Sequence, residues 1–254
     1  MNGMLNGLWP EQAGLTAAAA LAAGVLNAIA GGGSFLTFPA LVFAGVPPLA
    51  ANATSAMAVS PGYLGSTLGF RSELRELPAA LLRREVLLAA SGGLAGAALL
   101  LLTPARVFAG IVPWLLLLAT ALFALGPRLS RRSGGAGHPR WRSPGLWLVA
   151  AYGGYFNGGL GILLMALYSV TGETRLNTVN ALKNLNSLVL SLLSVAAFAL
   201  AGAIVWPQAV WMMLWATAGG WAGAHLAKRL PVRWVRRLVI ATGLVMSVVF
   251  FSRA

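Results

Sequence analysis

The chain of 254 residues is 58% hydrophobic and only 9% charged, with a net charge of +13 at neutral pH and no cysteine. A soluble domain normally carries about 25% charged residues, so this composition predicts an integral membrane protein and excludes an ordinary soluble domain. The lack of cysteine excludes thiol chemistry, thiolate metal sites and disulfide bonds. In a polytopic protein an excess of basic residues reflects loop orientation and contact with anionic lipid headgroups, so we expect no nucleic-acid partner.

The predicted elements fall into two similar series. The first half, 1–127, starts with an apolar segment broken by glycine, and three apolar runs follow, each near the ~20 residues that a bilayer requires. These four segments are 14–44, 48–70, 85–103 and 105–126. A basic linker, 128–143, leads to the second half, 144–254, which repeats the order. Its segments are a broken one at 144–170 and spans at about 176–200, 205–227 and 233–252.

Matching motifs indicate that the two halves are homologous. Three blocks recur in the same order at offsets of 127 to 130 residues. They are "GGLAGA" at 92–97 with "GGWAGA" at 219–224, Gly24, Asn27 and Gly31 with Gly154, Asn157 and Gly161, and "NA" at 52–53 with "NA" at 180–181. Any one block alone is at the level of chance, but three in order indicate duplication.

The basic residues predict how the halves are oriented. Three stretches are rich in Lys and Arg: 71–84, 127–143 and 228–237. The positive-inside rule places all three in the cytoplasm, which requires an odd number of crossings in each half. That number results if each broken segment is a re-entrant hairpin that returns to its own side and three transmembrane helices follow. The expected fold is therefore all-α and polytopic, with two inverted-topology repeats in the cell membrane and both termini outside.

The glycine breaks predict a binding site. In "LNAIAGGGSFLTFPAL" at 26–41, each of three consecutive glycines would cost about 1 kcal/mol inside a helix, so they mark a turn or a close approach to a ligand. Ser34 is expected to cap the following helix, whose free N–H groups attract anions. The alternative is that these glycines only allow close helix packing. The candidate residues are Asn27, Gly31, Gly32, Gly33 and Ser34, and in the second break Asn157, Gly158, Gly159 and Gly161.

Polar side chains follow one face of the spans after the breaks. In 176–200 they recur every three or four residues, the spacing of one helix face. They are Asn177, Asn180, Asn184, Ser187, Ser191 and Ser194, with Lys183 and Asn186 beside them; in 48–70 they are Asn52, Ser55, Gly62 and Ser66, with Thr54 beside them. Such a face should contact water or another helix rather than lipid. For the serines alone we expect interhelical hydrogen bonds, and for the amides around Lys183 a substrate pathway.

Lys183 is the most unusual residue of the chain. It lies eight residues beyond Arg175 and therefore about 12 Å deeper in the membrane, where a lysine costs at least ~2.5 kcal/mol. The carboxylates lie in loops or at the ends of predicted spans: Glu11, Glu73, Glu76, Glu85 and Glu173. A buried cation without a partner either loses its proton or attracts an anion from solution. We expect Lys183 to attract an anion; a purely structural role and titration during transport are the alternatives.

Three stretches resemble the TauE/SafE family of sulfite and organosulfur anion exporters: "GGGSFLTFPALVFAGVPPLAANATS" at 31–55, "GGYFNGGLGILLMAL" at 153–167 and "NALKN" at 180–184. The resemblance covers nearly the whole chain and implies two homologous halves and export of small sulfur-containing anions such as sulfite or sulfonates. It would place the substrate at Gly31 to Ser34, Asn52 to Ser55, Asn157 to Gly161 and Asn180 to Asn184. The second half departs from the first because it lacks the third consecutive glycine, the serine and the following proline.

Together these patterns predict a secondary transporter that works by alternating access, with no enzymatic activity, cofactor or metal ion, and the family resemblance implies export of sulfite or a sulfonate. Broken segments in inverted repeats are typical of such transporters. His225, at the end of a span, is a candidate coupling residue, although a histidine there is more often a helix-terminal cation. An anion channel and uptake of another small anion are alternatives. A retinal photoreceptor would need a buried counter-ion for Lys183, and an intramembrane enzyme would need a catalytic pair that the sequence lacks. The sequence leaves the oligomeric state open.

Overall fold

The structure, a computed structural model, describes residues 2–29, 32–132, 139–226 and 232–253. Every regular element in these ranges is helical, which confirms the predicted all-α class. The first half contains α1 (Asn2–Ile29), α2 (Ser34–Phe43), α3 (Pro48–Gly69), α4 (Arg71–Arg75), α5 (Ala79–Leu102) and α6 (Ala105–Arg132). The second half contains the 3-10 helix η1 (Pro139–Trp141), α7 (Arg142–Tyr155), α8 (Leu160–Val170), α9 (Leu176–Leu200), α10 (Trp206–Leu226) and α11 (Val232–Arg253).

Both helix breaks occur where the sequence predicts them. α1 ends at Ile29 and α2 begins at Ser34, and α7 ends at Tyr155 and α8 begins at Leu160. Gly32 has a φ of 100° and Gly159 a φ of 77°, a left-handed conformation that glycine adopts without steric cost. The backbone therefore requires glycine at these two positions. That the two hairpins re-enter the membrane stays a prediction.

The start of α5 corrects a predicted boundary. The apolar run begins at Glu85, but the helix begins at Ala79, directly after Pro78 at the N-cap. Residues 79–84 are good helix formers. The two arginines among them lower the hydropathy of this stretch but do not end the helix. Hydropathy thus marks the apolar part of a helix and not its end, so Glu85 lies within α5. α9 extends over Leu176–Leu200 as a helix; that it spans the membrane over this range stays a prediction.

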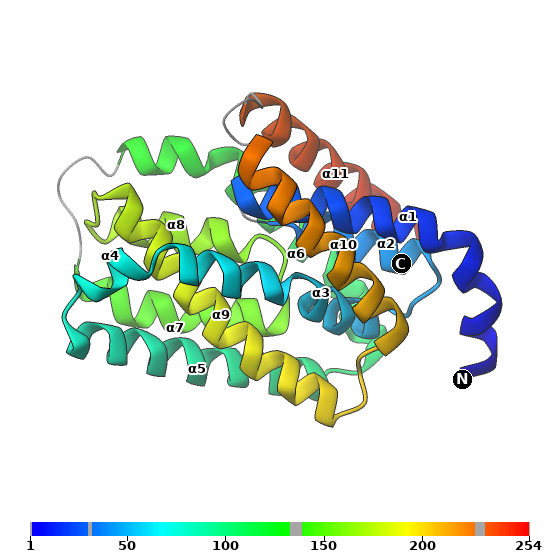
Figure 1. Cartoon of the computed structure of the whole chain (residues 1–254). Helices are drawn as coiled ribbons and strands as arrows, with labels where there is room; N and C mark the ends of the chain where they lie inside the picture. The colour runs from blue at the N-terminus through cyan, green and yellow to red at the C-terminus, as the bar shows by residue number, and fades with distance from the viewer. Residues whose placement is uncertain (1, 30–31, 133–138, 227–231, 254) are drawn as a thin grey trace.

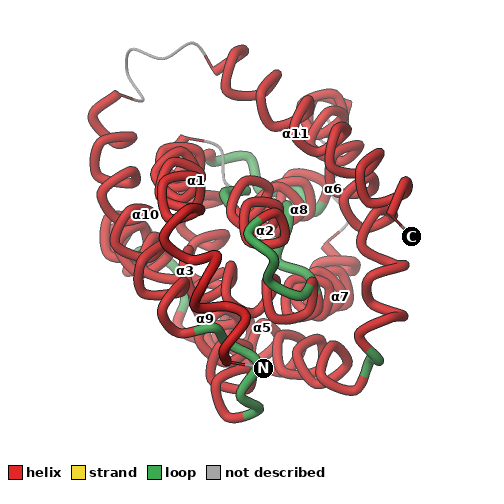
Figure 2. The backbone as a smooth tube through the Cα atoms, turned by 90° about the vertical axis from the view of Figure 1, so that its right-hand side faces the viewer, coloured by secondary structure: helices red, strands yellow, loops and turns green. Residues whose placement is uncertain are grey.

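The short helices α2 and α8 lie in the middle of the molecule, with the long helices around them (Figure 2). Seven of the 10 residues of α2 are buried. A helix that is apolar around its whole circumference is stable only when other elements enclose it. The sequence after each break therefore drives these two helices, and the breaks with them, into the interior.

In space the helices of the two halves interleave. α1 packs along α10, and α7 packs along α5, so the first helix of each half lies against the second span of the other half. We call α1, α2, α3 and α10 bundle A, and α5, α7, α8 and α9 bundle B (Figure 1). α3 and α9 join the bundles, and α6 packs with α11. Each of these contacts has its counterpart when the halves are exchanged, as expected for homologous halves.

Glycine allows the closest helix crossings within each bundle. A Cβ atom on Gly24 of α1 would lie 2.0 Å from the backbone oxygen of Ala216 in α10. In bundle B, a Cβ atom on Gly96 of α5 would lie 1.9 Å from the backbone oxygen of Ala151 in α7. Small residues bring helix backbones together in this way in membranes. The two crossings therefore leave no room for a side chain.

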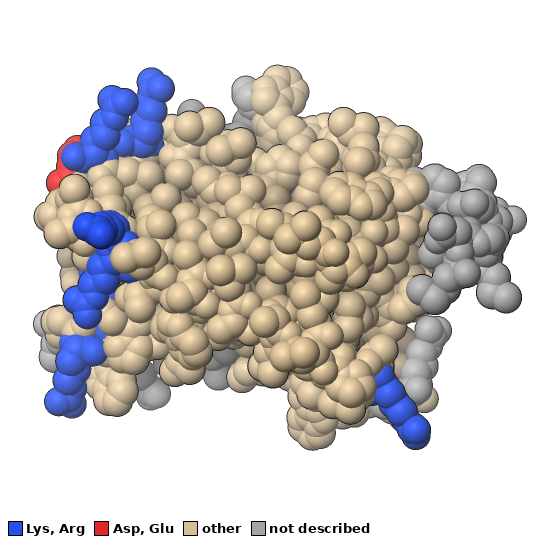
Figure 3. Space-filling view, turned by 90° about the horizontal axis from the view of Figure 1, so that it is seen from below, with Lys and Arg blue, Asp and Glu red and all other residues tan. Residues whose placement is uncertain are grey.

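The ends of the molecule differ in charge. Lys and Arg side chains gather mostly at the end where α4 and the first turns of α5 and α7 lie (Figure 3). The start of α1 and the end of α11 lie toward the opposite end (Figure 1). Within the described ranges, Ala79–Leu102 and Leu176–Leu200 have the length and hydropathy of a membrane span, and five further apolar helical stretches are shorter.

Candidate functional site

Asn27, near the end of α1, organises the first break. Its Oδ1 atom accepts a hydrogen bond of 2.7 Å from the backbone N–H of Gly33. Gly33 is the N-cap of α2, which corrects the expectation that Ser34 caps this helix. The cap acceptor comes from α1 instead, and the buried Ser34 hydroxyl has no hydrogen-bond partner in the described part of the chain. One of the donors expected to attract an anion is therefore already bound by Asn27.

The second break has different hydrogen bonds. The Oδ1 atom of Asn157, the counterpart of Asn27, lies 3.5 Å from the Tyr63 hydroxyl, at the upper limit for a hydrogen bond. The backbone oxygen of Gly158 accepts a hydrogen bond of 2.9 Å from the Tyr152 hydroxyl. Gly161 is buried in the first turn of α8. The two breaks are thus equivalent in backbone position but not in polar contacts.

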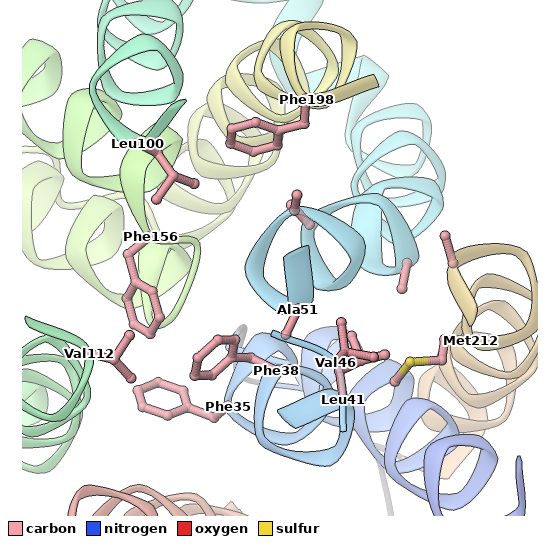
Figure 4. Close-up of a cluster of buried hydrophobic side chains, with 14 of the residues drawn as sticks. Phe35, Phe38, Leu41, Val46, Ala51, Leu100, Val112, Phe156, Phe198 and Met212 are labelled. Atoms are coloured by element: carbon pink, nitrogen blue, oxygen red, sulfur yellow. The ribbon is translucent and has the colours of Figure 1, made fainter. Parts of the chain in front are cut away.

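Aromatic side chains separate the two breaks. Phe35 of α2 lies beside the second break, 3.3 Å from where a Cβ atom of Gly159 would be. The rings of Phe38 and Phe156 meet edge to face with centroids 5.5 Å apart. Figure 4 shows all three buried side chains together with Val112 of α6. Apolar rings therefore pack against the described glycines of both breaks, Gly32 and Gly159.

The candidate residues of α3 bind other parts of the protein. Asn52 Nδ2 donates a hydrogen bond of 3.0 Å to the last backbone oxygen of α7. Thr54 Oγ1 accepts one of 3.0 Å from the backbone N–H just before α10. The Ser55 hydroxyl lies 2.6 Å from that of Thr37 in α2. These three side chains anchor α3 to both bundles, a role that needs no substrate.

α9 carries a row of buried polar groups. Lys183 is 8% exposed and Asn184 5% exposed, while Asn180 is half-buried one turn earlier. The two salt bridges of the described part join Arg142 with Glu85 and Arg175 with Glu173, so neither includes Lys183. Within the same part, the Ser187 hydroxyl is buried without a partner. We call Asn180, Lys183, Asn184 and Ser187 the α9 polar row.

Ser191 and Ser194 of α9 contact other helices, as the expectation of interhelical hydrogen bonds for the serines predicts. The Ser191 hydroxyl lies 2.7 Å from that of Ser60 in α3. The Ser194 hydroxyl donates a hydrogen bond of 3.2 Å to the backbone oxygen of Gly93 in α5. Interhelical hydrogen bonding is therefore confirmed for both serines.

A buried ionic cluster in bundle B escaped the sequence reasoning. Glu85 of α5 is 2% exposed. Its Oε1 atom lies 2.8 Å from Nε of Arg142 at the start of α7. Its Oε2 atom accepts hydrogen bonds from the Tyr168 hydroxyl of α8 at 2.5 Å and from Asn186 Nδ2 of α9 at 2.8 Å. We call these four residues the Glu85 cluster, which joins all four helices of bundle B.

Part of the Glu85 cluster could have been predicted from the sequence. Glu85 follows six residues that form a helix after Pro78, so the helix could have been extended backwards to bury it. Asn186 lies outside the polar stripe of α9, which indicates a partner in another direction. Two candidate residues lie outside what the structure describes: Gly31 is outside the described residues, and the side chain of His225 in α10 is not among those described.

The chain is similar to known membrane proteins over most of its length. The family model described as "Sulfite exporter TauE/SafE" matches residues 16–250. A probable membrane transporter protein, ORF9 of Sinorhizobium sp, is 26% identical over 242 residues, covering 91% of this chain and 88% of that protein. The probable membrane transporter protein YfcA of Escherichia coli strain K12 is 27% identical over 241 residues, covering 90% and 85%. No solved structure gives a significant match.

Proposed function

The chain belongs to the sulfite exporter TauE/SafE family, whose model covers residues 16–250, and we propose that it exports sulfite or a small sulfonate from the cytoplasm by alternating access. Membership of this family makes it a membrane transporter. The cargo, the direction of transport and the mechanism are the proposed parts.

Lys183 carries the proposal. It is the eighth residue of α9, which places it about 10 Å from the start of that helix. A buried ammonium group without a counter-ion is costly, and no carboxylate of the described part pairs with it. A bound anion would remove this cost. The amides of Asn180 and Asn184 and the hydroxyl of Ser187 would then replace the water around the oxygen atoms of that anion.

The cationic end of the molecule supports entry from the cytoplasm. Exposed arginines there, among them Arg71, Arg83 and Arg175, raise the local concentration of anions and would also contact anionic lipid headgroups. Arg175 directly precedes α9, so it lies on the way to the α9 polar row. An inside-negative potential favours exit of an anion by about 2.3 kcal/mol per charge per 100 mV.

Alternating access would move bundle A against bundle B, and not one sequence half against the other. The glycine crossings hold α1 to α10 and α5 to α7 at backbone contact, so each of these pairs moves as a unit. The buried Phe35, Phe38 and Phe156 between the breaks would form a barrier in this conformation. Such a barrier favours alternating access over a channel, which requires a continuous aqueous path.

We expect Lys183→Met to abolish stabilisation by anions without weakening the empty protein. Methionine fills a similar volume without a charge, so the cost of the buried cation, at least ~2.5 kcal/mol, disappears. Sulfite or a sulfonate at about 100 times its Kd would stabilise the wild type by about 2.7 kcal/mol and the variant not at all. Thermal unfolding of the purified protein with a panel of sulfite, sulfate, thiosulfate, a short sulfonate and acetate measures both effects.

Lys183→Arg is the matched control, because it keeps the charge and should keep part of the anion response. A lower melting temperature of the empty Lys183→Met protein, together with an unchanged anion response, would assign a structural role to Lys183. Saturable efflux from proteoliposomes that is lost in Lys183→Met and kept in wild type would confirm transport, whereas single-channel currents would favour a channel.

Both termini are expected to face the outside of the cell. By the positive-inside rule the gathered cationic residues would lie at the cytoplasmic end, and the start of α1 and the end of α11 lie toward the other end (Figure 1). A periplasmic alkaline phosphatase reporter fused after Ala254 should be active, and a cytoplasmic reporter such as green fluorescent protein should not fluoresce. The reverse result would contradict the inverted arrangement of the halves.

A further inference from the structure

The buried charges of the protein lie together in bundle B. Among the side chains whose burial the structure describes, Glu85 of α5 and Lys183 of α9 are the buried charged ones, with 2% and 8% exposed. Arg142 of α7, which is partly buried, pairs with Glu85 at 2.8 Å. The proposed function uses Lys183 and leaves Glu85 and Arg142 with a structural role.

Glu85 and Lys183 lie at similar levels of two neighbouring helices. Glu85 binds Asn186 of α9. Further along both helices Gly93 lies against Leu190, so α5 and α9 run in the same direction. Lys183 precedes Leu190 by seven residues and therefore lies on the same face of α9, two turns earlier. Seven residues before Gly93, α5 reaches the residue next to Glu85, so the α9 polar row passes the Glu85 cluster at roughly 10 Å.

The hydrogen bonds of Glu85 fit an ionised carboxylate. Its three partners, Arg142 Nε, the Tyr168 hydroxyl and Asn186 Nδ2, all donate to it. The Tyr168 oxygen accepts a hydrogen bond from Asn186 Nδ2, so the hydroxyl hydrogen is directed at Glu85. Arginine is always charged in proteins. Glu85 and Arg142 therefore form a pair of opposite charges whose sum is zero.

The charge inside bundle B is then one positive charge in the empty protein. The Lys183 ammonium, on which the proposed function rests, supplies it, because the Glu85–Arg142 pair contributes none. One singly charged anion beside Lys183 would bring this interior to neutrality. A doubly charged anion would leave a negative charge in excess, and excess charge is costly where the dielectric constant is low. The Glu85 carboxylate would repel that second charge.

Resting on the proposed function, we propose that Glu85 and Arg142 set the charge of the anion that the α9 polar row accepts, so that singly charged anions bind more tightly than doubly charged anions of similar shape. Glu85 determines this specificity through its charge and does not touch the anion. Without its carboxylate the row would face two positive charges, Arg142 and Lys183, and would favour a doubly charged anion. The selection depends on charge and not on the chemical class of the cargo.

Glu85→Gln tests the proposal, because it removes the negative charge and keeps the size of the side chain. The probes are methanesulfonate and sulfate, which are both tetrahedral and carry one and two negative charges. Two unit charges about 10 Å apart at an effective dielectric constant of about 20 interact strongly enough to change an affinity about tenfold or more. The ratio of sulfate to methanesulfonate affinity should therefore rise by about tenfold or more relative to wild type. Thermal shift over a range of anion concentrations measures both affinities, and the hydration of each anion is the same with every variant.

Arg142→Gln should act in the opposite direction. It removes a positive charge and leaves the buried charges of Glu85 and Lys183 at a sum of zero. The ratio of sulfate to methanesulfonate affinity should fall by about tenfold. This variant also decides the question if Glu85→Gln does not fold.

Two controls distinguish charge from altered packing. The double variant Glu85→Gln with Arg142→Gln removes both charges and leaves their sum unchanged, so the affinity ratio should stay within about threefold of wild type. Glu76→Gln removes the same charge at an exposed position, where water and salt screen it, and should leave the ratio unchanged.

The outcomes separate this inference from the proposed function. A wild type that binds sulfate as tightly as methanesulfonate would overturn the inference, as would a ratio that is equal in wild type, Glu85→Gln and Arg142→Gln. A double variant that shifts the ratio as far as Glu85→Gln would attribute the effect to packing and overturn it as well. In each of these cases anion binding that is lost in Lys183→Met leaves the proposed function in place. Anion responses that are the same in wild type and Lys183→Met would remove both.

Discussion

Replacing Glu85 with alanine is expected to destabilise the protein by about 3–5 kcal/mol, the range for removing one partner of a buried ion pair. Arg142, whose side chain is only 20% exposed, would lose its counter-ion. The Tyr168 hydroxyl and the Asn186 amide would lose their shared acceptor at the same time. Thermal unfolding in detergent, followed by tryptophan fluorescence, measures the loss as a lower melting temperature.

Two control variants distinguish the loss of the Glu85 cluster from the general effect of removing a carboxylate. Glu76→Ala removes an exposed carboxylate and should change stability by less than about 0.5 kcal/mol. The double variant Glu85→Met with Arg142→Met should recover much of the stability, because an apolar pair often replaces a buried ion pair without loss. A Glu85→Ala protein as stable as Glu76→Ala would show that the cluster does not hold bundle B together.

Gly96→Val is expected to prevent formation of the α5–α7 crossing and to cost about 3 kcal/mol or more, the upper range for overpacking. The first added atom would lie 1.9 Å from the Ala151 backbone oxygen. A backbone atom in a helix cannot rotate away as a side chain does, so the two helices must separate. The yield of monodisperse protein on size-exclusion chromatography and the melting temperature should both fall.

The same substitution at two other glycines gives the controls. Gly24→Val meets the Ala216 backbone oxygen at 2.0 Å and should be as harmful in bundle A. Gly110→Val on α6 has nothing within 4 Å and should be tolerated. Equal yields for Gly96→Val and Gly110→Val would mean that the crossing is not as close as described, and the rigid helix pairs proposed for transport would lose their basis.

The local features of this protein were predictable from the sequence because they depend on neighbouring residues. The helix class follows from composition and span length, and the breaks follow from glycines that the backbone conformation of Gly32 and Gly159 requires. The burial of Lys183 and Asn184 follows from the period of α9, since a polar stripe on a spanning helix turns away from lipid. The TauE/SafE resemblance was also carried by short motifs, and the match over 16–250 confirms it.

What only the tertiary structure decided depends on which helices pack together. Burial of Glu85 requires Arg142, Tyr168 and Asn186, which come from three other helices. The cap of α2 is Gly33, bound by Asn27 across the break, because an acceptor from another helix replaced the local serine.

A cavity between α1, α3 and α10 depends on packing in the same way. It required the interleaving of α10 with α1 and α3, since a glycine in a sequence does not indicate whether a neighbour fills the space beside it. Sequence thus determined which segments are helical, where they break and which face is polar. Packing between distant helices determined which polar groups are paired, which are free and where space remains.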